Sequence, residues 1–258
     1  MSILNWILLV DTNARMRLKA EASRLYLGWA WLAIEPLLWV TIFYLVFEVL
    51  MSRGKGEGFI IFLMIGKIPF LWFSKSVNRS SNSIMSNRQF IGKFYTPKVY
   101  FPYVAVQQVL YQQRPAFSIL ILSVLLAGYT LNAAWFWLLP LLTLQYLLIL
   151  LLSLVAALAV AFFEDLKILI PLGILFLMFT SGIFWDVNDI ADHNIKNLVL
   201  ANPLAFLLDA YRQILIKGEF VGGYRLAVLL AIMLIGLLLI HYLYGKLDTK
   251  VAEKVLNS

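Results

Sequence analysis

The residue types that could do covalent chemistry gather in one part of the chain. Asp186, Asp189, Asp192 and His193 follow one another closely, and carboxylates beside a histidine can act as general acid and base. A group-transfer enzyme at a membrane surface would need such a set. The sequence carries no Gly-x-x-x-x-Gly-Lys-Ser/Thr phosphate loop, no His-Glu-x-x-His zinc motif and no Gly-x-Ser-x-Gly elbow. Apart from that alternative, we expect a protein that is not an enzyme and that binds no cofactor, ATP or metal ion itself.

A second candidate site is a polar face on an otherwise apolar helix. Gln107, Tyr111, Arg114 and Ser118 follow each other at three- and four-residue intervals, so they share one side of a helix. Charge inside a membrane is costly and commonly marks a transport path. This face therefore either lines a hydrated path, or the helix projects from the membrane and Arg114 reaches the interface.

The composition excludes a soluble fold. The 258 residues are 62% hydrophobic and 14% charged, whereas a soluble domain is about half apolar and roughly a quarter charged. The chain is therefore predicted to be a polytopic membrane protein. Lys and Arg outnumber Asp and Glu by 21 to 14, which fits basic loops that face anionic membrane lipid rather than a nucleic-acid partner. The absence of cysteine excludes disulfides and thiolate metal sites.

Six apolar stretches are candidates for membrane spans of ~20 residues. They are Leu32–Met51, Phe59–Val77, Tyr103–Ala127, Trp135–Phe163, Ile168–Phe184 and Leu226–Tyr244. The expected fold is all-α, with six transmembrane helices in one domain over residues 1–258. If both termini are in the cytoplasm, the cytoplasmic segments carry more Lys and Arg than the external ones. Because cytoplasmic loops are usually the more basic, we expect that orientation. Lys67 in the second stretch could pair with Glu35 in the first.

Residues 1–31 predict an amphipathic helix on the cytoplasmic membrane surface. Asp11 and Thr12 offer an N-cap, and Arg15 and Lys19 belong to the basic face. The residues of the apolar face recur every three or four positions, about once per helical turn: Ala14, Leu18, Ala22, Leu25 and Trp29.

Residues 79–100 predict a second cytoplasmic helix, running from Ser80 toward Phe94, with serine and asparagine side chains as N-caps. Ile84, Arg88 and Ile91 would share one face of it. Such an apolar and basic ridge would either contact a partner protein or rest on lipid headgroups.

Residues 185–223 contain two apolar pieces, Ile195–Ala201 and Leu204–Ile216, each too short to cross a bilayer. Asn202 and Pro203 separate them as turn residues. This pattern predicts short external re-entrant helices before the last span. A plain amphipathic surface loop is the alternative.

Aromatic side chains make up 15% of the residues, and several lie inside the predicted spans. Trp39, Phe43 and Phe179 are candidates for the lining of a path, together with Arg114. Ring faces suit a sugar polymer because they stack on pyranose CH faces in any register. Lipid contact or packing is the alternative for each ring.

Four motifs in this order resemble a known family. They are Leu27-Gly28-Trp29-Ala30-Trp31-Leu32-x-x-Glu35-Pro36-Leu37, then Phe94-Tyr95-Thr96-Pro97-Lys98, then Phe162-Phe163-Glu164-Asp165-Leu166-Lys167-x-Leu169-x-Pro171, and finally Asn202-Pro203-Leu204 with Tyr211-Arg212 and Leu215-x-x-Gly218. The chain thus resembles the permease subunit of type-2 ABC exporters for polysaccharides, the O-antigen, capsule and teichoic-acid group. Glu164 departs from that pattern, because the family commonly has a basic residue before the aspartate.

The resemblance implies a homodimer that works with two separate ATPase subunits, which bind the ATP and Mg²⁺. The cargo would be a lipid-linked polysaccharide moved from the cytoplasm across the inner membrane. The resemblance also implies that the N-terminal helix, with Arg15 and Lys19, and the loop 79–100, with Ile84, Arg88 and Ile91, dock on the ATPase. Residues 185–223 would supply an external gate. Its candidate residues are Asn202, Pro203, Tyr211 and Arg212.

Two other classes remain as alternatives to this exporter. An ion-coupled secondary transporter would show broken helices in related halves of the chain, and no such pair is visible in the sequence. An integral-membrane glycan-transfer enzyme would use the cluster that includes Asp186 and His193.

Overall fold

A computed structural model describes residues 3–24, 26, 28–46, 58–219 and 223–257, and these residues form helices and no strand. The α-helices are α1 (Ile3–Ala22), α2 (Trp31–Tyr44), α3 (Gly58–Ser81), α4 (Arg88–Ile91), α5 (Tyr100–Leu126), α6 (Leu138–Phe162), α7 (Leu166–Thr180), α8 (His193–Ala201), α9 (Pro203–Arg212) and α10 (Gly223–Asn257). Short turns of 3₁₀ helix precede several of them, and a π-helical turn (Gln213–Lys217) follows α9. The all-α expectation is confirmed for the described residues.

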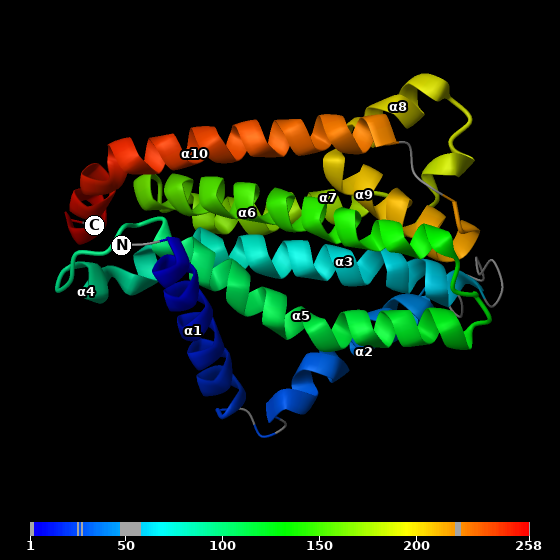
Figure 1. Cartoon of the computed structure of the whole chain (residues 1–258), viewed down its shortest axis with the longest axis horizontal. Coiled ribbons are helices and arrows are strands. Elements are labelled where there is room, and N and C mark those ends of the chain that lie inside the picture. The colour runs from blue at the N-terminus through cyan, green and yellow to red at the C-terminus, as the bar shows by residue number, and fades with distance from the viewer. Residues whose placement is uncertain (1–2, 25, 27, 47–57, 220–222, 258) are drawn as a thin grey trace.

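The long helices lie side by side, with α3 inside the bundle (Figure 1). Helices α5, α6, α7 and α9 all contact α3, and α10 packs on the far side of α6. Because α3 is buried on every side, its side chains are apolar around most of its circumference. Both termini and α4 lie at one end of the bundle, here called the α4 end, while α9 runs toward the other, the α9 end (Figure 1).

Four helices are long and apolar enough to cross a membrane: α3, α5, α10 and the helix Ala133–Phe162 that contains α6. A fifth crossing results if the bent pair His193–Ala201 and Pro203–Lys217 counts as one span. Four of the six predicted spans therefore have long helices at their positions. The count of six is not reached among the described residues, although the chain is clearly a multi-pass membrane protein.

The other two predicted spans are shorter in the structure. Helix α7 ends at Thr180, four residues before the predicted end, because Gly182 has φ +73°, a conformation that breaks a helix and suits glycine. Helix α2 covers the first part of the predicted Leu32–Met51 span, and the end of that span lies outside the described residues.

Helix α1 begins earlier than predicted. It starts at Ile3, so Asp11 and Thr12 lie inside the helix and cap nothing. The reason is that the apolar face extends backward from Ala14 to Val10, which is also buried against the core. Trp29 does not extend this face, since it lies in a separate turn and is exposed, and Leu25 is outside the described residues.

Candidate functional site

Side-chain hydrogen bonds join α1 to the bundle at two places, Asp11 near its middle and Glu21 near its C-terminal end. Glu21 accepts hydrogen bonds from Arg79 on α3 (2.8 Å) and from Gln108 (2.7 Å) and Gln112 (3.1 Å) on α5. Toward the N-terminus, Asp11 accepts a hydrogen bond from the Tyr111 hydroxyl. Helix α1 is therefore fixed to two of the long helices, α3 and α5.

The basic face of α1 stays accessible. The Arg15 side chain is 67% exposed and pairs with Asp11 at 2.9 Å, and Lys19 is exposed. Both residues keep the surface position that a docking role on a partner would need.

The loop 79–100 differs from the predicted single helix. Helix α3 continues to Ser81, a 3₁₀ turn follows at Met85–Asn87, and α4 is a separate short helix. Ser80 and Ser81 therefore end one helix instead of capping another.

The predicted ridge on this loop is wrong as a surface feature. Ile84 is 0% exposed and Ile91 is buried, and both belong to the same core cluster as Val251 and Val255 of α10. Arg88 is exposed and donates to the Leu256 carbonyl oxygen at 2.6 Å. The two isoleucines are therefore part of the core, with α4 in contact with α10, and they do not present an apolar edge to a partner.

Other side chains of this loop do form an apolar surface, which the sequence interpretation missed. Phe90 and Phe94 are 45% and 59% exposed, with ring centroids 5.1 Å apart, and Tyr95 beside them is 83% exposed. The four-residue spacing of the two phenylalanines was the available signal. Lys93 lies between them in sequence and is exposed.

One of the candidate path residues, Trp39, lies beside Lys67. Its ammonium group is 4.6 Å from the ring centroid of Trp39 on α2 and 3.1 Å from the sulfur of Met178 on α7. The structure therefore brings the first and fifth predicted spans together at one buried cation of α3. Glu35, a possible partner of Lys67 from the sequence, bonds to Lys75 instead, at 2.6 Å.

The remaining path candidates are placed less centrally. Phe179 is 54% exposed and contacts Phe184, and the side chain of Phe43 lies outside the described residues. Arg114 is exposed, with its guanidinium 4.3 Å from the Tyr111 ring centroid. Tyr111, about one turn before Arg114 on α5, also bonds to Asp11 of α1, so Arg114 lies near the contact between α5 and α1.

The four gate candidates lie on one short helix. Asn202 caps α9 by accepting from the Leu204 N–H (3.0 Å), and Pro203 occupies the first turn, where its missing N–H has no cost. The Asn202 amide also donates to Ser181 Oγ at 3.1 Å. Helix α8 meets the α9 segment at 102°, so the predicted break at this dipeptide is present.

Arg212 anchors α9 to the rest of the bundle. The side chain is 4% exposed, and its guanidinium donates to the carbonyl oxygens of Gly182 (2.5 Å) and Ile183 (2.9 Å). The guanidinium also lies 3.5 Å from the ring centroid of Phe62 on α3. Gly66 makes room for it, because a Cβ there would lie 2.6 Å from Arg212 Nη2.

The acidic cluster has structural partners in place of a catalytic geometry. Asp186 accepts from the Asn188 N–H and Asp192 from the Asn194 N–H, each at 2.8 Å, so both cap helical turns. The described part of the chain holds no group of three residues suited to a metal ion.

Between α6 and α7, the hydrogen bond from Lys167 (2.5 Å) lowers the pKa of Glu164, which fits a surface ion pair.

Comparison with known proteins gives one consistent family. A model described as "ABC-2 type transporter" matches residues 14–216. An O-antigen export system permease protein RfbA of Klebsiella pneumoniae is 26% identical over 213 residues, which cover 82% of this chain and 81% of the relative. A protein of the same description from Myxococcus xanthus is 26% identical over 230 residues, with 88% and 87% covered.

Proposed function

Because the chain belongs to the ABC-2 type transporter family, we propose that it is the transmembrane subunit of an ATP-driven exporter of lipid-linked polysaccharide. The similarity to O-antigen export permeases along at least 82% of the chain carries this proposal. Two copies pair in the inner membrane and work with two separate ATPase subunits, which hold the ATP and Mg²⁺. The cargo moves from the cytoplasm outward. The missing phosphate loop fits this division of labour.

Purification of the tagged chain from its native membrane tests the proposal. An ATPase subunit should co-purify, and the complex in lipid nanodiscs should hydrolyse ATP faster when lipid-linked polysaccharide is added. The chain alone should hydrolyse none. Unchanged surface polysaccharide in a strain that lacks this chain would contradict the proposal, whereas sugar transfer by the chain alone would favour the glycan-transfer enzyme.

Docking of the ATPase is assigned to the α4 end of the bundle. The exposed Phe90, Phe94 and Tyr95 provide apolar contact there, and Arg15 and Lys19 provide charge on α1. Helix α1 reaches this loop through Arg17, which donates to Asn87 at 3.0 Å. This assignment replaces Ile84 and Ile91 as contact residues and keeps the loop 79–100 as the coupling segment.

Cysteine labelling tests the orientation, with both termini in the cytoplasm. The chain has no native cysteine, so a single introduced thiol reports its own side. Ser83 is buried, but Ser86 and Thr130 are exposed at opposite ends of the bundle. In intact cells an impermeant thiol reagent should label Thr130→Cys and spare Ser86→Cys until the membrane is opened. The reverse pattern would overturn the orientation.

We propose that α2 and α7 of the two copies line one shared path for the polysaccharide in the dimer. If the Trp39 and Phe179 rings stack on passing sugars, each alanine variant should slow export by a factor of about five, as for a contact of ~1 kcal/mol. Phe136→Ala is the matched control, because that ring is 84% exposed on another segment. Rates of surface polysaccharide appearance measure the effect. Equal rates in all three variants would mean that Trp39 and Phe179 only pack or face lipid.

A further inference from the structure

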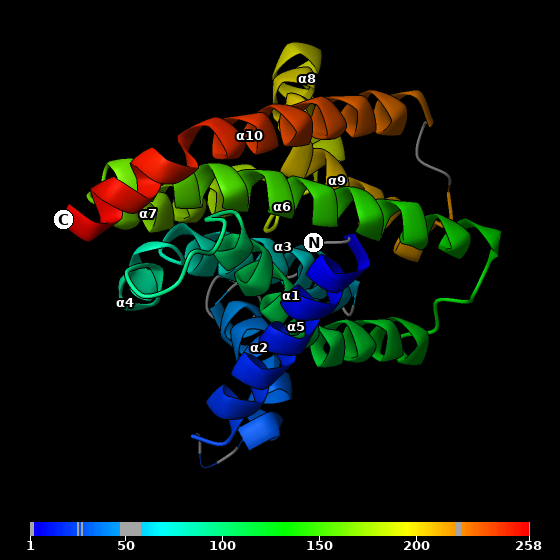
Figure 2. The same ribbon diagram turned by 60° about the vertical axis from the view of Figure 1, so that its left-hand side comes forward.

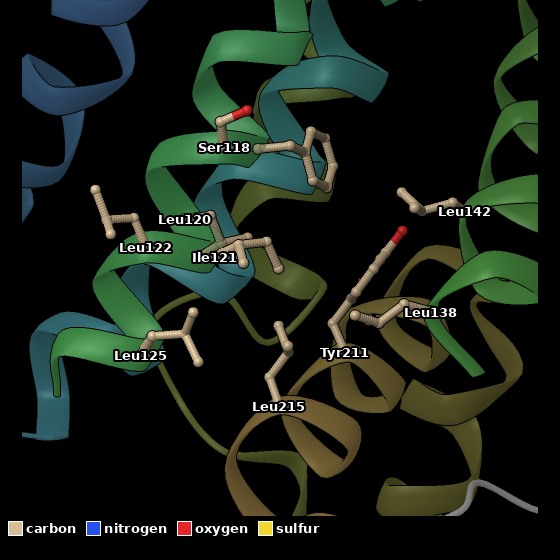
Figure 3. A pocket seen from close by; sticks show the side chains of 10 residues that line it. Ser118, Leu120, Ile121, Leu122, Leu125, Leu138, Leu142, Tyr211 and Leu215 are labelled. Atoms are coloured by element: carbon tan, nitrogen blue, oxygen red, sulfur yellow. The ribbon is translucent and has the colours of Figure 1, made fainter. Parts of the chain in front are cut away.

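A groove opens between α5 and α6 near the α9 end of the bundle. It has a volume of about 540 Å³, within the range of small-molecule sites. The lining comes from three segments (Figure 3). Helix α5 supplies Phe117, Ser118, Leu120, Ile121, Leu122 and Leu125, and the start of α6 supplies Leu138 and Leu142. Tyr211 of α9 and Leu215 of the following turn complete it. Almost all of this lining is apolar.

Two hydroxyl groups belong to this lining, and the one on Ser118 already donates to the Arg114 carbonyl oxygen at 3.1 Å. The other is that of Tyr211. The Tyr211 ring rises from α9 with its hydroxyl end toward Leu142 (Figure 3). The residue is 1% exposed, and no described group hydrogen-bonds with its oxygen. A buried hydroxyl without a partner is unfavourable, so the groove is suited to a ligand that is apolar but carries a hydrogen-bond acceptor at this position.

The groove continues deeper between the same two helices. A second hollow of about 380 Å³ shares Phe117 and Leu142 with the first and extends to Leu110 and Tyr146. Most of its lining surface is apolar, although Gln113, Arg114 and Thr143 also line it, and it leads along α5 toward the middle of the bundle. Together the two spaces form a long slot, and the Tyr211 hydroxyl lies toward Leu142, which both spaces share.

Both walls of the slot belong to helices that can span the membrane. The slot therefore lies between helices at membrane depth, where phospholipid is the most abundant amphipathic molecule. A phospholipid ester places one carbonyl acceptor at the head of each apolar chain, near the bilayer surface. Its order, with the acceptor toward the surface and the chain toward the middle, matches the order of Tyr211 and the deeper hollow.

We propose that this slot binds one acyl chain of a membrane phospholipid from the leaflet at the α9 end, and that the Tyr211 hydroxyl donates a hydrogen bond to its ester carbonyl. The bound chain contacts α5, α6 and the α9 segment at once, so the lipid links the short helix to two of the long ones.

The test compares two lipids with identical headgroups and chains, a dioleoyl phosphatidylcholine ester and its diether analogue, which lacks the carbonyl oxygen. The purified full-length chain is given each lipid, and native mass spectrometry measures the fraction that retains one lipid. The wild-type chain should retain the ester lipid roughly 2- to 10-fold better, the range expected for one hydrogen bond.

Three variants locate the contact. Tyr211→Phe should retain both lipids equally, since it removes the hydroxyl and keeps the ring. Leu122→Trp, at the exposed edge of the groove, should reduce retention of both. Tyr242→Phe, an exposed tyrosine on α10, is the matched control and should behave as the wild-type chain does.

Each contrary outcome rejects the proposal. Equal retention of both lipids by the wild-type chain, or an ester preference that survives Tyr211→Phe, would show that the hydroxyl does not contact the carbonyl. Full retention by Leu122→Trp would place the lipid elsewhere. Loss of both lipids whenever the chain dimerises would mean that a second copy of the chain fills the groove.

Discussion

Arg212→Ala should lower the free energy of unfolding by about 3 kcal/mol and sharply reduce polysaccharide export. The substitution leaves the Gly182 and Ile183 carbonyl oxygens buried without their donor, and each buried unpaired group costs about 1–3 kcal/mol. It also removes the contact with the Phe62 ring. Export should fall because α9 then loses its attachment to α3 and to the end of α7. Thermal unfolding in detergent and the rate of surface polysaccharide appearance measure the two effects.

Two further variants separate the anchor from general damage. Arg212→Lys keeps the charge but cannot donate in two fixed directions, so it should show a smaller version of both losses. Gly66→Ala leaves Arg212 in place but introduces a Cβ 2.6 Å from its Nη2, so it should weaken the same attachment from the α3 side. Arg225→Ala, an exposed arginine at the start of α10, should change neither quantity. Wild-type stability and export in Arg212→Ala would rule out the anchor.

The sequence predicts the helices better than it predicts which of their faces are buried. Hydrophobic content alone locates α3, α5, α6 and α10, because a 20-residue apolar run has few other uses. The break between α8 and α9 is also predictable, since Asn202 and Pro203 are both strong local signals. These features depend on neighbours in sequence, which is why they need no knowledge of the packing.

The errors come from contacts between distant segments. Glu35 pairs with Lys75, about two turns of α3 beyond Lys67, and the choice depends on how α2 crosses α3. Ile84 and Ile91 have the spacing of an exposed ridge, yet both are buried in a core cluster that includes residues of α10. A helix pattern shows that two residues share a side but does not say what lies against that side.

The path and gate candidates show the same division. Asn202, Pro203, Tyr211 and Arg212 lie together because they are near in sequence and share α9. Trp39 and Met178 come together at Lys67, a relation across three helices that no local spacing contains. The unpartnered hydroxyl of Tyr211 is likewise a property of the packed structure alone.

The second large effect concerns the loop 79–100, where folding and coupling should be separable. Ile84→Ala removes a side chain that is 0% exposed, and such a truncation in a core costs about 2–5 kcal/mol. We expect reduced thermal stability, with loss of the contact between α4 and α10. Any loss of ATPase binding in this variant would follow from that unfolding, so it would not identify a contact residue.

Phe94→Ala should leave the stability of the chain almost unchanged and weaken its binding to the ATPase. The ring is 59% exposed and touches Phe90, so its loss should change the free energy of unfolding by less than about 1 kcal/mol. If the rings fill a pocket on the ATPase, binding should weaken by about 2 kcal/mol, roughly 30-fold. Affinity of the chain in nanodiscs for the purified ATPase measures this. Phe136→Ala, an exposed ring at the other end of the bundle, is the control. Unchanged affinity in Phe94→Ala and in the double variant with Phe90→Ala would place the ATPase contact on another surface, of which the exposed basic face of α1 is the next to examine.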